Sequence, residues 1–138
     1  MVNNFRIHKL LYSEIKSVYP ELFDKILNEK DIPSYIYIGF LEERYVGSIS
    51  VYLHDMDSAY LQWAGFDENI GKYYRPILFK KVVSFIHQDY RNIICRIENT
   101  NTPALKVALN TGFKIIGTRL DGVLFVEMIK TKETKNGT

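Results

Sequence analysis

The residues most able to take part in chemistry gather around two predicted strands. Glu68 and Glu98 each follow or end a strand, and Tyr60 lies within the first of these two strands. Carboxylates and phenols can exchange protons, so these three are candidates for acid–base chemistry, although strand-end carboxylates are also common as plain surface groups. Lys72 and Arg75 lie in the segment that follows Glu68. Their positive charges either bind a phosphate or belong to a solvated loop.

The cysteine and the histidines predict neither a disulfide nor a metal site. Cys95 is the single cysteine, so no internal disulfide can form, and we expect it to be a buried strand residue. Its strand, 92–97, is short, apolar and β-branched, which indicates burial on both faces. The histidines at positions 8, 54 and 87 are scattered, without the spacing of metal ligands. We therefore expect no metal, and the single cysteine fits a cytoplasmic protein.

Composition predicts one globular domain. Hydrophobic residues make up 46% of the 138 residues and charged residues 25%. A formal net charge of +2 is too small to predict binding to nucleic acid or to an anionic membrane surface. No apolar run is long enough to span a bilayer, and the N-terminus does not begin as a signal peptide does.

The hydrophobic pattern alternates between strand-like and helix-like segments. Ser13 is a plausible N-cap for a first helix, which Pro20 interrupts so that a second helix begins there. Pro76 begins a later helix, and Gly112 stands where a helix C-terminal glycine belongs. Strands are expected at 5–11, 35–41, 46–52, 59–66, 92–97, 113–120 and 123–130, with later helices at 76–88 and 102–110.

The order of these segments predicts the fold class. Three successive strands form a meander, and a strand–helix–strand crossover follows it. This arrangement gives an α/β (α+β) fold, with a mixed central sheet of six to seven strands and helices on both faces. Asp121-Gly122 predicts the turn of a final hairpin. We expect one domain over residues 1–130 and a flexible tail over 131–138.

Two local sequences resemble those of the GNAT-type N-acetyltransferases. Residues 101–117 read NTPALKVALNTGFKIIG, in which Asn101 precedes a short apolar helix, and Gly112-Phe113 enters a strand. This is similar to the family's signature of Asn, a small residue three positions on, and Gly-Phe. Residues 40–52 resemble the family's hairpin of an apolar strand, a charged turn and Val-Gly-x-Ile. The order of elements agrees with the family over most of the chain.

The resemblance implies an acetyl-CoA-dependent enzyme that transfers an acetyl group to a primary amine by direct attack. In that family two parallel strands, here 59–66 and 92–98, splay apart and admit the pantetheine arm. The pyrophosphate rests at the start of the following helix. Such a transfer needs a base for the amine and a proton source, and the candidates for these tasks are Glu68, Glu98 and Tyr60. The resemblance places the following residues beside the cofactor: Phe66, Gly71, Lys72, Tyr73, Tyr74, Arg75 and Asn101.

The sequence departs from the family pattern at two places. The cofactor loop usually carries two glycines, whereas residues 68–76 retain Gly71 at most, as in compact, glycine-poor members often found in bacteriophage genomes. The usual proton donors are also replaced: Ala108 stands at the position of the family's Tyr, and Ala104 at that of its Ser. An alternative is therefore a catalytically inactive GNAT-like domain that acts as a binding or structural module. The acceptor is a small-molecule or protein amine, and a homodimer is possible.

Overall fold

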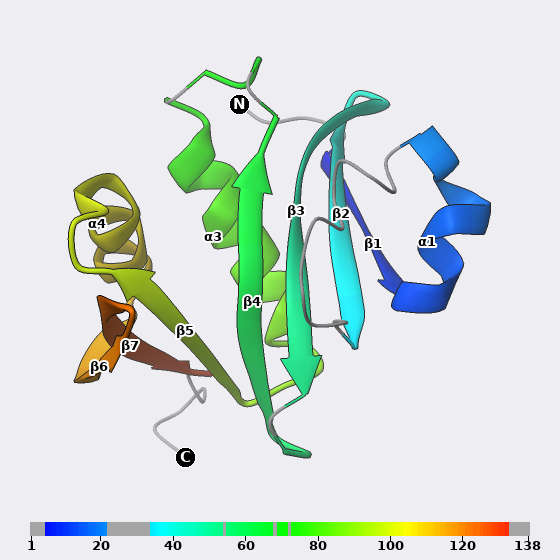
Figure 1. The fold of residues 1–138 in the computed structure, drawn as a ribbon. Coiled ribbons are helices and arrows are strands. Elements are labelled where there is room, and N and C mark those ends of the chain that lie inside the picture. The colour runs from blue at the N-terminus through cyan, green and yellow to red at the C-terminus, as the bar shows by residue number, and fades with distance from the viewer. Residues whose placement is uncertain (1–4, 22–33, 54, 68, 72, 133–138) are drawn as a thin grey trace, which may run out of the picture.

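Seven strands form one mixed sheet in the computed structural model, which describes residues 5–21, 34–53, 55–67, 69–71 and 73–132 (Figure 1). The strand order is β1-β2-β3-β4-β5-β7-β6, and only the β4–β5 pair is parallel. This confirms the predicted mixed sheet. The strands are β1 (Phe5–Leu11), β2 (Tyr35–Leu41), β3 (Arg44–Leu53), β4 (Ser58–Phe66), β5 (Asn92–Glu98), β6 (Lys114–Asp121) and β7 (Val123–Thr131).

Helices cover both faces of the sheet, as predicted (Figure 1). One face carries α1 (Tyr12–Val18), and the other carries α3 (Arg75–Ile86) and α4 (Thr102–Thr111). Successive side chains of β2 point to opposite faces of the sheet and so contact the helices on both sides. Tyr37 joins the core beneath α3, whereas Ile36 and Ile38 pack with Ile15 of α1. No helix in the described ranges is long and apolar enough to cross a membrane.

The N-terminal helix begins two residues earlier than the Ser13 cap predicts, at Tyr12. Leu11 is the N-cap, and its N–H donates to Glu14 Oε1 at 2.8 Å. The carboxylate three residues on thus satisfies the N–H of the cap residue, whereas Leu11 supplies no side-chain acceptor to the first turn. Tyr19 breaks the helix, and the chain is helical again at Pro20 and Glu21, as the proline predicts.

The helix–strand joint at Gly112 has the predicted geometry. Gly112 ends α4 with φ 110°, a left-handed conformation that favours glycine. Phe113 follows with 2% of its surface exposed, and it packs in the core beneath α3 and α4. The next hairpin ends in β7, which continues through Thr131, and Lys132 N–H donates to the Arg91 carbonyl at 2.7 Å. The rest of the predicted tail lies outside the described residues.

One prediction about β5 is wrong. Its apolar run indicated a strand buried on both faces, but only Ile93 and Cys95 are buried, whereas Ile94 and Arg96 on the other face are partly exposed. The physical reason lies in the layering: α3 and α4 cover one face of the sheet at β5, and α1 packs on β2 instead. A partly open face is therefore present beside the parallel strand pair.

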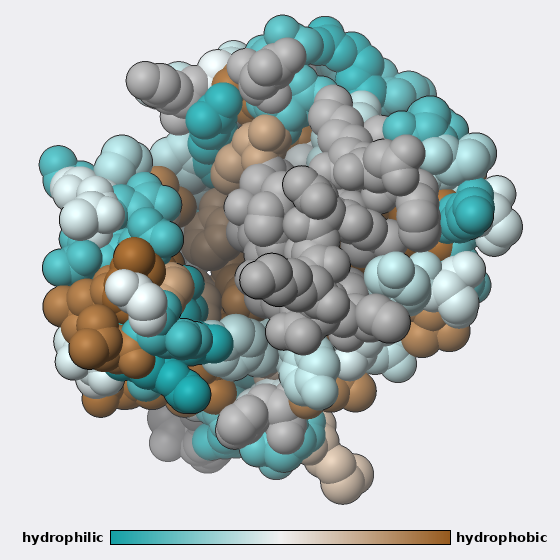
Figure 2. Space-filling model, in the orientation of Figure 1, coloured by the Kyte–Doolittle hydropathy of each residue, from teal (hydrophilic) through white to brown (hydrophobic). Residues whose placement is uncertain are grey.

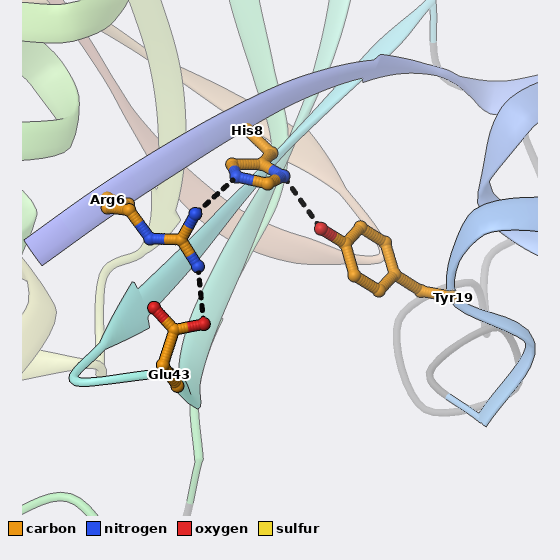
Figure 3. A network of polar contacts seen from close by, with 4 residues as sticks. All are labelled: Arg6, His8, Tyr19 and Glu43. Carbon is orange, nitrogen blue, oxygen red and sulfur yellow. Dashed lines mark hydrogen bonds and ion pairs between the residues drawn. The ribbon is translucent and has the colours of Figure 1, made fainter.

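A polar network joins β1 to its neighbours far from this parallel pair (Figure 3). Arg6 Nη2 donates to Glu43 Oε2 at 2.9 Å, and Arg6 Nη1 lies 3.5 Å from His8 Nε2. Tyr19 Oη lies 2.6 Å from His8 Nδ1. Glu43 belongs to the β2–β3 turn, so the network ties β1 to that turn and to the end of α1. This accounts for His8 as a structural residue.

Candidate functional site

The parallel strands β4 and β5 separate before either of them ends (Figure 1). Their pairing runs from Ser58 with Asn92 to Leu61 with Cys95, and goes no further. Beyond that point β4 stays paired with β3 as far as Phe66, and β5 stays paired with β7 as far as Glu98. The facing backbone groups of 62–66 and 96–98 therefore have no partner in the sheet ladder and can bind a ligand.

A β-bulge accounts for the separation. Ser50 of β3 pairs with Trp63, but the next residue, Val51, pairs with Leu61, so Gln62 is an extra residue in β4. A bulge bends and twists its strand. Because Gln62 comes directly after the last residue that pairs with β5, the bend carries the end of β4 away from β5.

The divergence leaves a cavity of about 530 Å³ between the two strands. This volume lies in the range of small-molecule sites. Among the residues that the structure describes, no tyrosine lines the gap. The lining is mostly apolar with four polar or charged groups: Leu61, Phe66, Arg75, Phe79, Cys95, Arg96, Ile97, Glu98, Asn101, Pro103, Ala104, Val107, Ala108 and Phe125.

Arg75 stands at the wall where α3 begins. Its Nε donates to the Ile70 carbonyl at 3.1 Å, and its guanidinium carbon lies 6.0 Å from the centre of the Phe66 ring. These contacts hold the guanidinium at the end of β4. The first turn of a helix also presents unpaired N–H groups and partial positive charge, although Pro76 supplies no N–H. This wall of the cavity therefore favours an anion.

Asn101 stands at the opposite wall, where α4 begins. Its Oδ1 accepts a hydrogen bond from Ala104 N–H at 3.4 Å, so the side chain caps the helix. Asn101 also lines the cavity, and its position beside a cofactor stays a prediction. The contact that the structure shows for Asn101 is the cap itself.

Arg96 lies at the inner end of the gap, one residue beyond the last β4–β5 pair. Its Nε donates to the hydroxyl of Tyr60, and its guanidinium carbon lies 5.4 Å from the Tyr60 ring centre and 5.5 Å from that of Phe125. The hydrogen bond that Arg96 donates to Tyr60 is the main cause of a raised pKa for Arg96. A fixed cation thus faces the cavity.

Two of the three predicted catalytic residues lie around this cation. Glu98 ends β5 and lines the cavity with Arg96. Tyr60 is not part of the lining and contacts the cavity through Arg96. Glu68, like the predicted cofactor residue Lys72, lies outside the described residues.

The structure brings together only some of the predicted cofactor residues. Phe66, Arg75 and Asn101 line the cavity. Gly71 and Tyr74 instead line a second cavity of about 210 Å³, where Tyr74 N–H donates to the Gly71 carbonyl at 3.0 Å. Tyr73 is 82% exposed, and its ring centre lies 5.8 Å from that of Tyr74.

Sequence reasoning missed Arg96. The signal that could have found it is strand alternation, because Arg96 lies between Cys95 and Ile97, two residues that pack in the core, and so must point to the other face. Arg96 lines the cavity because the β4–β5 pairing ends one residue before it, and no local sequence pattern predicts where that pairing ends.

Cys95 is buried, as predicted. Burial raises the pKa of its thiol to about 12, so the sulfur stays protonated at neutral pH. It forms part of the cavity wall without being a reactive thiolate. In the described ranges, no three His, Cys, Asp or Glu residues lie together as metal ligands.

The strand order and the split between β4 and β5 define a class: the chain has the fold of the GNAT-type acetyltransferases. No protein-family model matches its sequence, and no curated protein does. Its fold is similar to that of a GNAT family acetyltransferase from Elizabethkingia anophelis with acetyl-CoA bound, with a TM-score of 0.66 and 15% identity, covering 94% of this chain and 99% of that chain.

Two further structures have the same fold. The N-acetyltransferase PseH from Campylobacter jejuni, in complex with acetyl coenzyme A, matches with a TM-score of 0.66 and 14% identity, covering 94% of this chain and 99% of that chain. The spermidine N-acetyltransferase SpeG from Vibrio cholerae, as a point mutant, matches with a TM-score of 0.67 and 12% identity, covering 93% and 94%. At such identities the likeness establishes the fold, and the activity must be argued from the site.

Proposed function

We propose that this protein is an N-acetyltransferase that uses acetyl-CoA to acetylate a primary amine by direct attack. The observation that carries the proposal is the cavity between the diverging ends of β4 and β5. The similar proteins from Elizabethkingia anophelis and Campylobacter jejuni have acetyl-CoA bound in structures of the same fold. The apolar lining suits a thioester arm, and the unpaired backbone groups suit its amides.

The ends of the cavity match the two chemically different ends of acetyl-CoA. Arg75 and the first turn of α3 offer positive charge to the phosphates at the outer end. Arg96 offers positive charge at the inner end, where an oxyanion would develop on the thioester carbonyl. Arg75 partly replaces the glycines that the loop lacks, because its side chain can bind phosphate where backbone approach is restricted.

The proposed reaction joins an amine nitrogen to the carbonyl carbon and breaks the carbon–sulfur bond. The amine must lose a proton, and the departing sulfur must gain one. Glu98 is the proposed proton acceptor, since its carboxylate lines the cavity. Tyr60 is the proposed positioning residue for Arg96, because it accepts that residue's hydrogen bond. A water molecule returns the proton to the sulfur.

The alternative, an inactive binding or structural module, predicts a closed or crowded gap. An open cavity of about 530 Å³ argues against it. The two hypotheses differ in one measurable property, which is the turnover of acetyl-CoA in the presence of an amine.

Calorimetric titration with acetyl-CoA tests the binding step. We expect heat of binding and a raised melting temperature, since a ligand at a hundredfold excess over Kd stabilises by about 2.7 kcal/mol. Ala104→Trp should block binding by filling the cavity, because Ala104 lines it. Lys81→Trp, at an exposed position on α3, is the matched control and should bind normally.

A thiol-release assay with a panel of amines tests the chemistry. The single cysteine is buried, so the thiol reagent reports free CoA with little background. Acetyl-CoA binding without release of CoA for any amine would favour the inactive module. If Ala104→Trp folds normally and still binds acetyl-CoA with unchanged affinity, the cavity is the wrong site.

A further inference from the structure

β6 is an edge strand with large apolar side chains in contact with solvent. Ile115 is 56% exposed, Ile116 58% and Leu120 77%. Figure 2 shows hydrophobic surface gathered over the β6–β7 hairpin at the left of the molecule. An exposed apolar edge strand is a template for pairing with another strand.

The register of the β6–β7 hairpin fixes which side chains share a face. Ile115 pairs with Met128, and Gly117 pairs with Glu127, so Ile116 is an extra, bulged residue. The side chains of Ile115, Thr118 and Leu120 therefore point to the α4 side of the sheet, as does that of Met128. The opposite face carries Lys114, Gly117, Arg119 and Asp121.

We propose that β6 pairs antiparallel with β6 of a second copy of this chain, with Thr118 on the two-fold axis. Moving outward from the axis, Gly117 faces Arg119 of the other copy. Each strand then passes its bulged Ile116, which shifts the register by one residue. Ile115 consequently faces Leu120 on the α4 side of the joined sheet, and Lys114 faces Asp121 on the opposite side, so the two members of each pair share a face.

This register is self-complementary in both polarity and charge. It forms two apolar Ile115–Leu120 pairs and two Lys114–Asp121 ion pairs. The neighbouring registers are worse: centring the axis on Arg119 would place two guanidinium groups opposite each other, and centring it on Gly117 would place Arg119 opposite Lys114. Neither Lys114 nor Asp121 belongs to the Arg6–Glu43 or Lys9–Asp89 ion pair. Asp121 acts on Arg96 of its own chain through its charge, which helps to raise the Arg96 pKa.

The dimer leaves the proposed active site accessible. β5 and β7 lie between β6 and the β4–β5 gap, so the joined edges do not cover the cavity. A two-fold pairing also closes on itself and uses both free β6 edges, so no third copy can add at β6. Oligomeric state and acetyl transfer can therefore be tested independently.

A charge-swap experiment on the full chain tests the register. Sedimentation equilibrium should show a concentration-dependent dimer. Lys114→Asp and Asp121→Lys should each raise the dimer dissociation constant by about tenfold or more. The two-fold axis repeats the pair, so each variant creates two pairs of like charges across the interface. The double variant restores opposite charges and should restore the dimer. Lys81→Asp carries the same charge change on exposed α3 and should leave the dimer intact.

A disulfide cross-link tests whether Thr118 lies on the two-fold axis. Thr118→Cys places two thiols across the two-fold axis, at a separation that a disulfide can span, and mild oxidation should give a covalent dimer. Ser84→Cys, exposed on α3, is the control and should not cross-link. A monomer at all concentrations, larger aggregates in place of a dimer, or a dimer unaffected by both single charge reversals would each overturn the proposal.

Discussion

At the scale of single residues, the site depends on how two side chains hold each other. Arg96 donates to the Tyr60 hydroxyl and lies between the rings of Tyr60 and Phe125. Aromatic faces attract a guanidinium, and the hydrogen bond fixes its orientation. The cation is therefore fixed in place before any ligand binds, which is the condition under which a charge stabilises a transition state effectively.

Replacement of Arg96 tests this role. In an enzyme with the proposed activity, Arg96→Ala should lower kcat by about tenfold to a thousandfold, as the loss of one preorganised donor does. Tyr60→Phe should lower kcat less, and the effects should not add in the double variant because the two residues act together. Steady-state kinetics measures both. Arg91→Ala, at an exposed position, is the control, and additive effects would contradict the pairing.

At the scale of elements, the ends and irregularities of helices and strands position the site. The bulge at Gln62 parts β4 from β5, and Asn101 caps the helix that forms the far wall. Gly112 ends that same helix and returns the chain to the sheet. The bulge, the helix cap and the helix end are each local features, yet together they set the width of the cavity.

Gly112→Ala should destabilise the protein by about 1–2 kcal/mol, because its φ of 110° is unfavourable for a residue with a Cβ. Crowding is not the cause, since the nearest heavy atom to the added carbon is the flexible end of Lys130, at 3.4 Å. Gly117→Ala is the matched control: nothing lies within 4 Å of its added carbon, and its φ is not positive. Urea unfolding measures both, and equal losses would contradict the backbone explanation.

At the scale of the whole molecule, a single continuous sheet links all of these parts. A large core of side chains from the sheet, α3 and α4 occupies one face, and a smaller one around Ile15 occupies the other. Both are built on the same strands, so the described parts of the chain should unfold together. Any buried group whose protonation differs between the folded and unfolded states then affects global stability.

His87 is such a group. Burial is the main cause of its lowered pKa, with Lys130 and Lys132 contributing, while its Nδ1 hydrogen bond to the Tyr90 carbonyl at 3.1 Å opposes the shift. Its Nε2 is buried and has no hydrogen-bond partner among the described residues. The folded state therefore resists protonation at pH values where the unfolded chain accepts a proton.

The free energy of unfolding should accordingly fall as pH drops below about 6.5, the ordinary pKa of histidine. Above that pH both states hold the neutral ring, and His87 adds no pH dependence. His87→Asn keeps a donor for the Tyr90 carbonyl and removes the titration, so its stability should change less with pH. Urea unfolding at several pH values measures the difference, and parallel curves for both proteins would contradict the prediction.

The sequence by itself determined most of the elements and their order, since periodicity, Pro20, Pro76 and the turn at Gly122 are local signals. It also determined the joint at Gly112, because only glycine takes that backbone conformation easily. It did not determine the N-cap of α1, which is Leu11 and not Ser13, with the Glu14 carboxylate accepting from the Leu11 N–H.

Only the tertiary structure decided the site. The place where β4 and β5 stop pairing follows from a bulge against a third strand, and the exposed face of β5 follows from where the helices pack. Arg96 became a site residue, and Gly71 and Tyr74 joined a different cavity, for that reason. Contacts between distant segments leave no periodic pattern in the sequence. A local pattern can therefore single out a residue, but it cannot predict which distant residues lie beside it.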